Sequence, residues 1–190
     1  MIEITFLGTV SGIPTKDRNH SAIAVEHYGE QKDTLLWDCG EGTQRQLMHA
    51  GISFMDIDKI FISHWHADHF AGLIPLIQTM NLEKWKMELK NFGPEAEIFV
   101  ADIIDLGYFG LRFPVEAINV PFEGDEITKI FSSDEYDVFS IPVLHTVPAV
   151  AYCFQESDRW NIDLQKLKAK NLGRGYWLNK LKAEGKAEYK

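Results

Sequence analysis

Apolar and polar residues alternate along the opening of the chain, which is the pattern of half-buried β-strands. Residues 2–7, 21–25 and 34–37 are rich in β-branched, aromatic and aliphatic side chains, and polar or glycine-containing segments separate them. A polar turn at residues 29–33 joins the second run to the third. The pattern predicts a meander of three strands. It does not predict a dinucleotide-binding unit, because no glycine-rich turn leads from one of these strands directly into a helix.

The middle of the chain changes to a helical period. Thr43, with Gln46 three residues later, has the spacing of a capping box, and Gly51 is placed to end the helix that follows. Residues 59–62 form a short apolar run that predicts a buried strand. After it, apolar residues recur at helical spacing and predict a helix with Pro75 in its first turn: Leu73, Ile74, Leu76, Ile77 and Met80.

Further along the chain the segments are shorter. The pattern predicts a turn at residues 91–94, a strand at 97–101, a helix at 102–109, and strands at 115–120, 137–143 and 149–154. At 190 residues the chain is expected to form a single domain, residues 1–190, of the α/β class.

The candidate chemistry lies in the run Ser63-His64-Trp65-His66-Ala67-Asp68-His69, directly after the apolar run 59–62. A chain that leaves a strand is still extended, so the side chains of His64 and His66 project the same way and supply half of a tetrahedral zinc shell. Asp68 and His69 follow where the chain begins to turn, and can face a second ion. The alternative is a histidine-rich surface turn, which the strand before the run and the apolar helix after it make the poorer interpretation.

Two further residues are candidates for this site because each follows a predicted strand. His145 lies two residues beyond the strand at 137–143, where it can supply the third imidazole, although alone it would be taken for a structural histidine. Asp38 follows the strand at 34–37, where its carboxylate could orient an imidazole through the free ring N–H. A turn-forming aspartate is the alternative at this position.

Charge is distributed unevenly along the chain. The formal net charge is −9, but residues 159–190 carry nine Lys or Arg and three Asp or Glu, a local charge of +6 against −15 for the rest. This asymmetry is typical of an arm that grips a polyanion, and a solvated amphipathic helix explains it equally well. Cys39 and Cys153 are too few for a disulfide framework and are expected to be small buried side chains. With no membrane span or leader sequence, the expected compartment is cytoplasmic.

Several stretches together resemble a known family. His64-x-His66-x-Asp68-His69 is similar to the signature of the metallo-β-lactamase fold. The segments 6–19 (FLGT, GIPT and RN), 38–44 (DCGEGTQ) and 143–148 (VLHTVP) resemble ribonuclease Z, the endonuclease that processes the 3′ end of tRNA, over residues 1 to about 185. The resemblance implies an αββα sandwich of which this chain covers mainly the N-terminal half, so that only one of the two sheets is expected.

The resemblance also implies a function and a set of site residues. It implies a two-zinc phosphodiesterase that removes the 3′ trailer of precursor tRNA, with His64, His66 and His145 on one zinc, Asp68 and His69 on the other, and Asp68 as general base. The substrate-binding residues that it suggests are Arg18, Lys166, Lys168, Lys170 and Arg174. The resemblance also implies that the basic segment, residues 159–190, corresponds to the protruding arm with which these enzymes hold tRNA. It differs from that arm at residues 172–177, which read LGRGYW where many members are rich in glycine and proline.

The resemblance leaves the ligand set incomplete. A bridging aspartate and a last histidine of the family have no counterpart, since no histidine follows His145. Because only one of the two sheets is expected, its face of Val, Ile, Leu and Phe side chains would be left uncovered. The chain is therefore expected to pair with a second copy of itself, or to be unstable alone. Two other functions stay open: a hydrolase of the same fold acting on a thioester, lactone or cyclic nucleotide, and a non-catalytic homologue that binds RNA or another partner.

Overall fold

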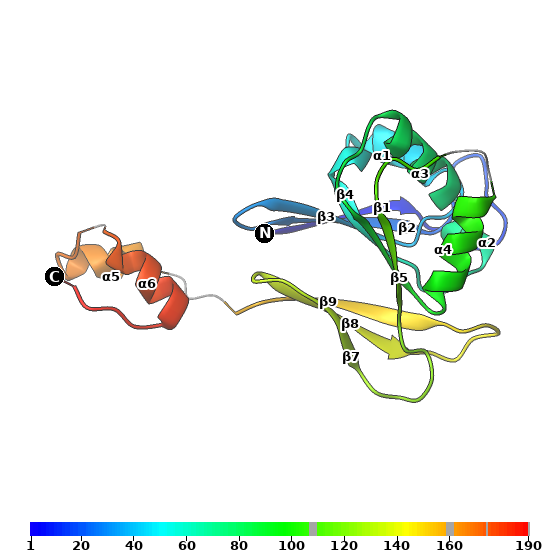
Figure 1. Ribbon diagram of the computed structural model, residues 1–190. Helices are drawn as coiled ribbons and strands as arrows, with labels where there is room; N and C mark the ends of the chain where they lie inside the picture. Colours follow the sequence, from blue (N-terminus) through cyan, green and yellow to red (C-terminus); the bar gives the residue numbers. More distant parts are fainter. Residues whose placement is uncertain (107–109, 159–161, 174, 190) are drawn as a thin grey trace.

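The computed structural model describes residues 1–106, 110–158, 162–173 and 175–189. Two β-sheets form the body of the molecule (Figure 1). The first has the order β1-β2-β3-β4-β5-β6, antiparallel from β1 to β3 and parallel from β3 to β6. Its strands are β1 (Ile2–Gly8), β2 (Ala22–Tyr28), β3 (Lys32–Trp37), β4 (Ile57–Phe61), β5 (Leu89–Gly93) and β6 (Val115–Asn119).

The second sheet is antiparallel, with the order β7-β8-β9. Its strands are β7 (Thr128–Ser132), β8 (Tyr136–Pro142) and β9 (Val150–Glu156). The expectation of only one sheet was therefore wrong. The alternating pattern of the second half supplies three strands, and their inner residues bury the central part of one face of the first sheet.

The helices lie on the side of the first sheet opposite β7–β9 (Figure 1). They are α1 (Thr43–Ala50), α2 (Ala67–Phe70), α3 (Leu73–Leu82) and α4 (Ala96–Asp105), with a 3₁₀ turn at Phe54–Asp56. One apolar core, which includes Leu47, Leu76 and Val100 from these helices, lies between them and the sheet. A second core, centred on Leu35, Phe61 and Phe92, lies between the two sheets. The described part of the body therefore has three layers: helices, sheet and sheet.

The three opening strands, the helix that ends at Gly51, the buried strand at 59–62 and the helix containing Pro75 are confirmed. The capping role of Thr43 was wrong. Gly42, with a φ of 81°, is the N-cap without a side-chain bond, and the Thr43 hydroxyl donates instead to the carbonyl of Gly40 at 2.7 Å.

Two other predictions were wrong because short windows hid the period. Residues 91–94 belong mostly to strand β5, and 97–101 belong to helix α4. The buried residues of α4 are Ala96, Val100 and Ile103, a helical spacing that a five-residue window cannot show. The end of the predicted helix at 107–109 lies outside the described residues. Cys153 is exposed, against expectation, whereas Cys39 is buried.

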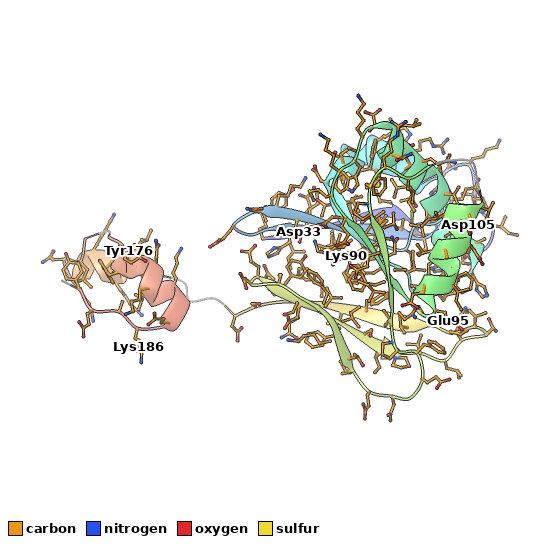
Figure 2. The ribbon with its side chains drawn as sticks, viewed as in Figure 1. Asp33, Lys90, Glu95, Asp105, Tyr176 and Lys186 are labelled. Carbon is orange, nitrogen blue, oxygen red and sulfur yellow. The ribbon has the colours of Figure 1, made fainter. Side chains whose placement is uncertain are left out.

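The basic segment forms two short helices, α5 (Leu164–Ala169) and α6 (Trp177–Glu184), which lie apart from both sheets (Figure 1). Figure 2 shows Tyr176 and Lys186 on this separate part of the chain. Its own contacts hold it together: the rings of Trp177 and Tyr189 meet edge to face at 5.2 Å, and the Gly173 N–H donates to the Tyr189 hydroxyl. Across the described residues, no helix has the length and apolar character needed to cross a membrane.

Candidate metal centre

Three imidazole rings from two distant parts of the chain meet beyond the ends of strands β4 and β8, one from each sheet. His64 and His66 follow β4, and His66 still has extended backbone angles as the N-cap of α2. His145 lies in the loop between β8 and β9 of the other sheet. One ring nitrogen from each residue lies within 4.8 Å of the other two, and His145 Nε2 is 3.4 Å from His66 Nδ1. The predicted His64–His66–His145 cluster is therefore present in the fold.

A hydrogen bond between the sheets fixes this meeting point. The Val150 N–H, at the start of β9, donates to the carbonyl of Ser63 at 3.0 Å. It ties the end of the loop that carries His145 to the residue before His64. Together with the aromatic core between the two sheets, this bond keeps the loop of His145 close to His64 and His66.

Asp38 and Ser63 orient the imidazoles. The Asp38 carboxylate accepts from His69 Nδ1–H at 2.6 Å and from the Ser63 N–H at 2.8 Å. The Ser63 hydroxyl lies 3.1 Å from Asp38 Oδ2 and 3.0 Å from His64 Nδ1. When this hydroxyl donates to Asp38, its oxygen accepts from His64 Nδ1–H, which leaves the lone pair of His64 on Nε2. The orienting role predicted for Asp38 agrees with these contacts.

The loop at residues 38–40 holds this arrangement at close quarters. Asp38 has a φ of 55°, which is unusual for a residue other than glycine and marks a constrained backbone. A Cβ added at Gly40 would lie 2.3 Å from the backbone carbonyl oxygen of Asp68, so only glycine fits there. The Cys39 N–H donates to the His69 carbonyl at 2.7 Å. The Asp-Cys-Gly sequence is thus needed to seat α2 beside the site.

Burial and neighbouring charges separate the protonation of the two central histidines. Burial, with the nearby His69, lowers the pKa of His64 to about 4, so that His64 is neutral at physiological pH. Burial acts to lower the pKa of His69 too, but the Asp38 carboxylate outweighs it and raises that pKa. His64 is thus ready to act as a neutral ligand, whereas His69 is held by its carboxylate partner.

Asp68 lies beside His69, with Oδ2 3.6 Å from His69 Nε2. Its carboxylate accepts from the backbone N–H of Gly12 at 2.7 Å. Burial acts to raise the pKa of Asp68, but this hydrogen bond and the charges of His69 and His20 outweigh it, so the pKa is lowered. Asp68 is therefore an ionised acceptor at neutral pH.

The donor set fits a metal ion of the borderline class. Three converging imidazoles suit zinc, and the depressed pKa of His64 removes the proton that would compete with the ion. The second pair, Asp68 and His69, supplies two donors. In the described part of the chain, His64, His66 and His145 are the one group of three or more potential ligands close enough to share an ion.

The predicted substrate residues lie away from the three imidazoles. Arg18 is exposed and lines a cavity of about 250 Å³ with Lys16 and Arg45, on the loop that also brings Gly12 to Asp68. Lys166 and Lys168 are exposed on α5, and Lys170 is exposed at its C-cap. Arg174 lies outside the described residues.

Two parts of the site were missed from the sequence, namely Ser63 and the backbone of Gly12. Serine beside a histidine motif has no distinctive pattern, and a backbone N–H has none at all. The backbone of Gly12 has a φ of 48°, a conformation that favours glycine, but only the structure reveals it.

Comparison with known proteins agrees with this geometry. A family model described as "Anti-Pycsar protein Apyc1" matches residues 2–95, which include His64–His69 but neither His145 nor the basic segment. Ribonuclease Z of Pyrococcus abyssi is 43% identical over 183 residues, and ribonuclease Z of Methanococcus maripaludis (strain C5) is 40% identical over 182 residues. Each alignment covers 95% of this chain but only 57% and 56%, respectively, of the relative.

Solved structures show the same relationship. The short form of human tRNase Z is 30% identical, with a TM-score of 0.69, over 82% of this chain and 65% of that one. The metallo-β-lactamase fold protein YhfI of Bacillus subtilis, 20% identical with a TM-score of 0.62, covers 81% of this chain and 58% of its own. This second likeness concerns the fold alone. The chain is therefore a homologue of ribonuclease Z with the metallo-β-lactamase fold, and it spans just under three fifths of the length of these two curated relatives.

Proposed function

We propose that this chain is the metal-binding and RNA-binding part of a zinc-dependent endoribonuclease that removes the 3′ trailer from precursor tRNA. The observation that supports it most is the convergence of His64, His66 and His145 from two sheets, in a chain about 40% identical to ribonuclease Z over nearly its whole length. We propose two Zn²⁺ ions as cofactors, His64, His66 and His145 as ligands of the first, and Asp68 and His69 as ligands of the second.

When bound, zinc supplies Lewis acidity, which lowers the pKa of water and neutralises charge on a phosphate. The chain's own residues prepare the site for that chemistry. Asp38 and Ser63 fix the tautomers and directions of His69 and His64. Asp68, ionised and held by the Gly12 N–H, is positioned as the general base that accepts a proton. We propose this catalytic role for Asp68.

The basic segment is proposed to bind RNA. Lys166, Lys168 and Lys170 are exposed together on α5 and at its end, away from the acidic body, where they can contact phosphates without reaching the reacting centre. Arg18 is proposed as a further phosphate contact on the body, and Arg174 as one on the segment. The proposed partners are precursor tRNA and a second copy of the chain, and the proposed compartment is the cytoplasm.

One experiment tests the proposed function directly. The purified chain, loaded with zinc, is mixed with a precursor tRNA that carries a labelled 3′ trailer, and release of the trailer is followed on a gel. His66→Ala is expected to lower bound zinc and abolish release, whereas His49→Ala, on an exposed face of α1, is expected to change neither. Zinc content that is unchanged in His66→Ala would remove the metal site from this cluster.

A second candidate, a non-catalytic RNA-binding homologue, is favoured by one observation. Asp68 and His69 supply two ligands to the second ion, and the described residues bring no third group close enough to join them. Such a protein would bind precursor tRNA and hold one zinc ion without releasing the trailer. Metal stoichiometry and trailer release, measured on the same sample, separate the two functions.

A hydrolase of the same fold that acts on thioesters would instead turn over a thioester and leave bis(p-nitrophenyl) phosphate uncleaved.

A further inference from the structure

The two histidines that follow β4 lie in a stretch of chain whose backbone is not held by hydrogen bonds. Ser63 is the last residue before it that is held: its N–H donates to the Asp38 carboxylate at 2.8 Å, and its carbonyl accepts from the first residue of β9. Helix α2 begins only after His66. Within the described part of the chain, no hydrogen bond reaches the backbone of His64 or Trp65. Backbone pairing therefore does not decide the path of the chain between Ser63 and α2.

Trp65, between the two histidines, is the side chain that anchors this stretch. Because the chain is extended here, Trp65 points away from its neighbours, and it is buried in the core between the helices and the first sheet, with 9% of its surface exposed. Its ring stacks on Phe99 of α4 with the centroids 4.7 Å apart, and it meets Phe70 of α2 edge to face at 5.5 Å. Its indole N–H donates to the carbonyl of Pro94. One side chain thus contacts two helices and the residue that follows β5.

The surface on which Trp65 packs is itself fixed by the first sheet. Gly93 ends β5, and its carbonyl accepts from the Val120 N–H at 2.8 Å. A Cβ added at Gly93 would lie 3.2 Å from Trp65 Cζ2, tighter than an ordinary contact, so the ring packs closely on this backbone. Phe99 lies in the first turn of α4, just after Glu95, which Figure 2 labels. The ring is therefore held between ordered elements, and the stretch that carries the histidines is attached to them through it.

A second buried tryptophan shows that the hydrogen bond is a specific feature of Trp65. Trp85 lies in the same core and is 6% exposed, but its indole N–H has no partner among the described residues. It precedes β5 and lines a cavity with Asp58 and Lys59, near the start of β4, at the end of these parallel strands away from the histidines. Burying an indole N–H costs free energy unless it is bonded, so the bond to Pro94 favours one orientation of Trp65. Trp85 therefore serves as a matched control.

We propose that Trp65 is a positioning residue for the metal centre: by anchoring the stretch between β4 and α2, it aims the rings of His64 and His66 at His145. The centroids of the three rings lie between 4.6 and 5.1 Å apart. A smaller side chain at position 65 would let the stretch take several paths, and the rings would converge for a smaller fraction of the time. The affinity for an ion falls by that fraction. The inference rests on the proposed ligands, but on neither RNA binding nor cleavage.

Nuclear Overhauser effects between the imidazole rings test the positioning without metal or RNA. They are measured in chelator-treated protein that carries isotope-labelled histidine. The unsubstituted chain and Trp85→Leu are expected to show effects among the three rings, and Trp65→Leu to lose them. Where Trp65→Leu does not fold, Trp65→Phe is compared with Trp85→Phe, and weaker effects are expected in Trp65→Phe, because phenylalanine keeps an aromatic ring but has no N–H to donate. Equal effects in the Trp65 and Trp85 variants would overturn the proposal.

Zinc affinity measures what the positioning contributes. Trp65→Leu is expected to raise the Kd for zinc roughly 10- to 100-fold, as loss of other groups that orient metal ligands does, and Trp65→Phe up to about fivefold, for the lost hydrogen bond. Trp85→Leu and Trp85→Phe should leave this Kd unchanged, although each lowers the free energy of unfolding, as its Trp65 counterpart does. With Co²⁺ in place of Zn²⁺, the visible absorption bands of a tetrahedral site should weaken in Trp65→Leu and persist in Trp85→Leu.

The matched pairs separate positioning from general destabilisation. Equal losses of zinc affinity in the Trp65 and Trp85 variants would overturn the proposal, because the affinity would then follow the stability of the core. If the unsubstituted chain binds no zinc, the proposed ligands fail, while the effects between the rings in metal-free protein still decide whether Trp65 positions them.

Discussion

Asp38 is placed to act on the proposed metal site through His69, since its carboxylate accepts from His69 Nδ1–H at 2.6 Å. Asp38→Asn keeps the size of the side chain but replaces the carboxylate that accepts the His69 N–H and the Ser63 N–H. We expect roughly 10- to 100-fold weaker zinc binding, the usual effect of losing such a partner. Competition with a chromophoric chelator measures the Kd. Asp102→Asn on the exposed side of α4 is the matched control, and an unchanged Kd in Asp38→Asn would show that the carboxylate does not orient the ligand.

The depressed pKa of His64 predicts how the metal-free protein responds to acid. The folded chain resists protonating His64 until about pH 4, whereas the unfolded chain takes up that proton near the ordinary value of 6.5. The unfolded state therefore binds more protons between these values, and the contribution of His64 to the free energy of unfolding falls as pH falls from 6.5 to 4. His69, with its raised pKa, contributes in the opposite sense, because its stabilisation is lost as pH rises through the folded pKa.

We therefore expect His64→Gln to flatten the pH dependence of stability between pH 6.5 and 4 in chelator-treated protein. Urea unfolding at several pH values gives the free energies. His49→Gln, an exposed histidine, should retain the slope of the unsubstituted chain. A His64→Gln profile that matches the unsubstituted one would mean that the folded environment does not shift this group.

The residues that were predictable from the sequence are those with a strong spacing signal. His64, His66, Asp68 and His69 lie within six residues after a buried strand, so short-range geometry was enough. His145 needed the second sheet to bring it near, and its strand-end position was the only local sign. Trp65 gave no sign of an anchoring role, because Pro94, to which its indole N–H donates, is 29 residues away and only the fold brings them together.

At the scale of elements, prediction failed where a short run of residues fits both a strand and a helix, or neither. The apolar run in α4 contains Ile98, Phe99 and Val100 in sequence, which reads as a strand over five residues, but Ile98 is exposed and Val100 is buried. Strand β7 was missed because Thr128–Ser132 has no fully buried residue, and its Lys129 and Ser132 are exposed. Both errors lie in elements whose identity depends on what packs against them.

Helix α5 and its C-cap expose three lysines, Lys166, Lys168 and Lys170, whose contribution to RNA binding can be tested together. Replacing Lys166, Lys168 and Lys170 together by serine is expected to weaken precursor tRNA binding and to make the salt dependence of log K shallower, by up to about 0.9 for each lost phosphate contact. Hydrolysis of a small phosphodiester, where present, should be unaffected, because these side chains lie on the separate segment. Including Arg174→Ser in the same variant should weaken precursor tRNA binding further.

The matched control for this prediction is a triple serine variant of Lys84, Lys86 and Lys129, which are exposed on the body. It removes the same charge from the molecule and should leave the salt slope nearly unchanged. If both triple variants weakened binding equally, net charge rather than the segment would set the affinity for RNA.

At the scale of the whole molecule, the second sheet covers the first only in part. Its last strand, β9, lies over β2 and β3: Tyr152 packs against Trp37 at 5.5 Å, and Phe154 against His27. Beyond it, the same face of β1 carries a stripe of apolar residues, Ile2, Ile4 and Phe6, of which Ile4 is 57% and Phe6 67% exposed. The predicted uncovered face is therefore confined to one strand, since β7–β9 bury the central part.

The stripe on β1 predicts that this chain associates with itself. Apolar side chains in a row along an edge strand favour contact with a second apolar surface, and a second copy offers the same stripe. We expect light scattering to show a mass that rises with protein concentration, and Ile4→Thr with Phe6→Thr to give monomers, because threonine keeps the strand but removes most of the apolar surface. Zinc binding by the three histidines should persist in that variant.

The second ion should bind more weakly than the first in both proteins, because Asp68 and His69 supply only two ligands to it. A stable monomer that binds two zinc ions equally tightly would contradict both expectations, since it would show that neither the exposed stripe nor the two-ligand site needs a partner.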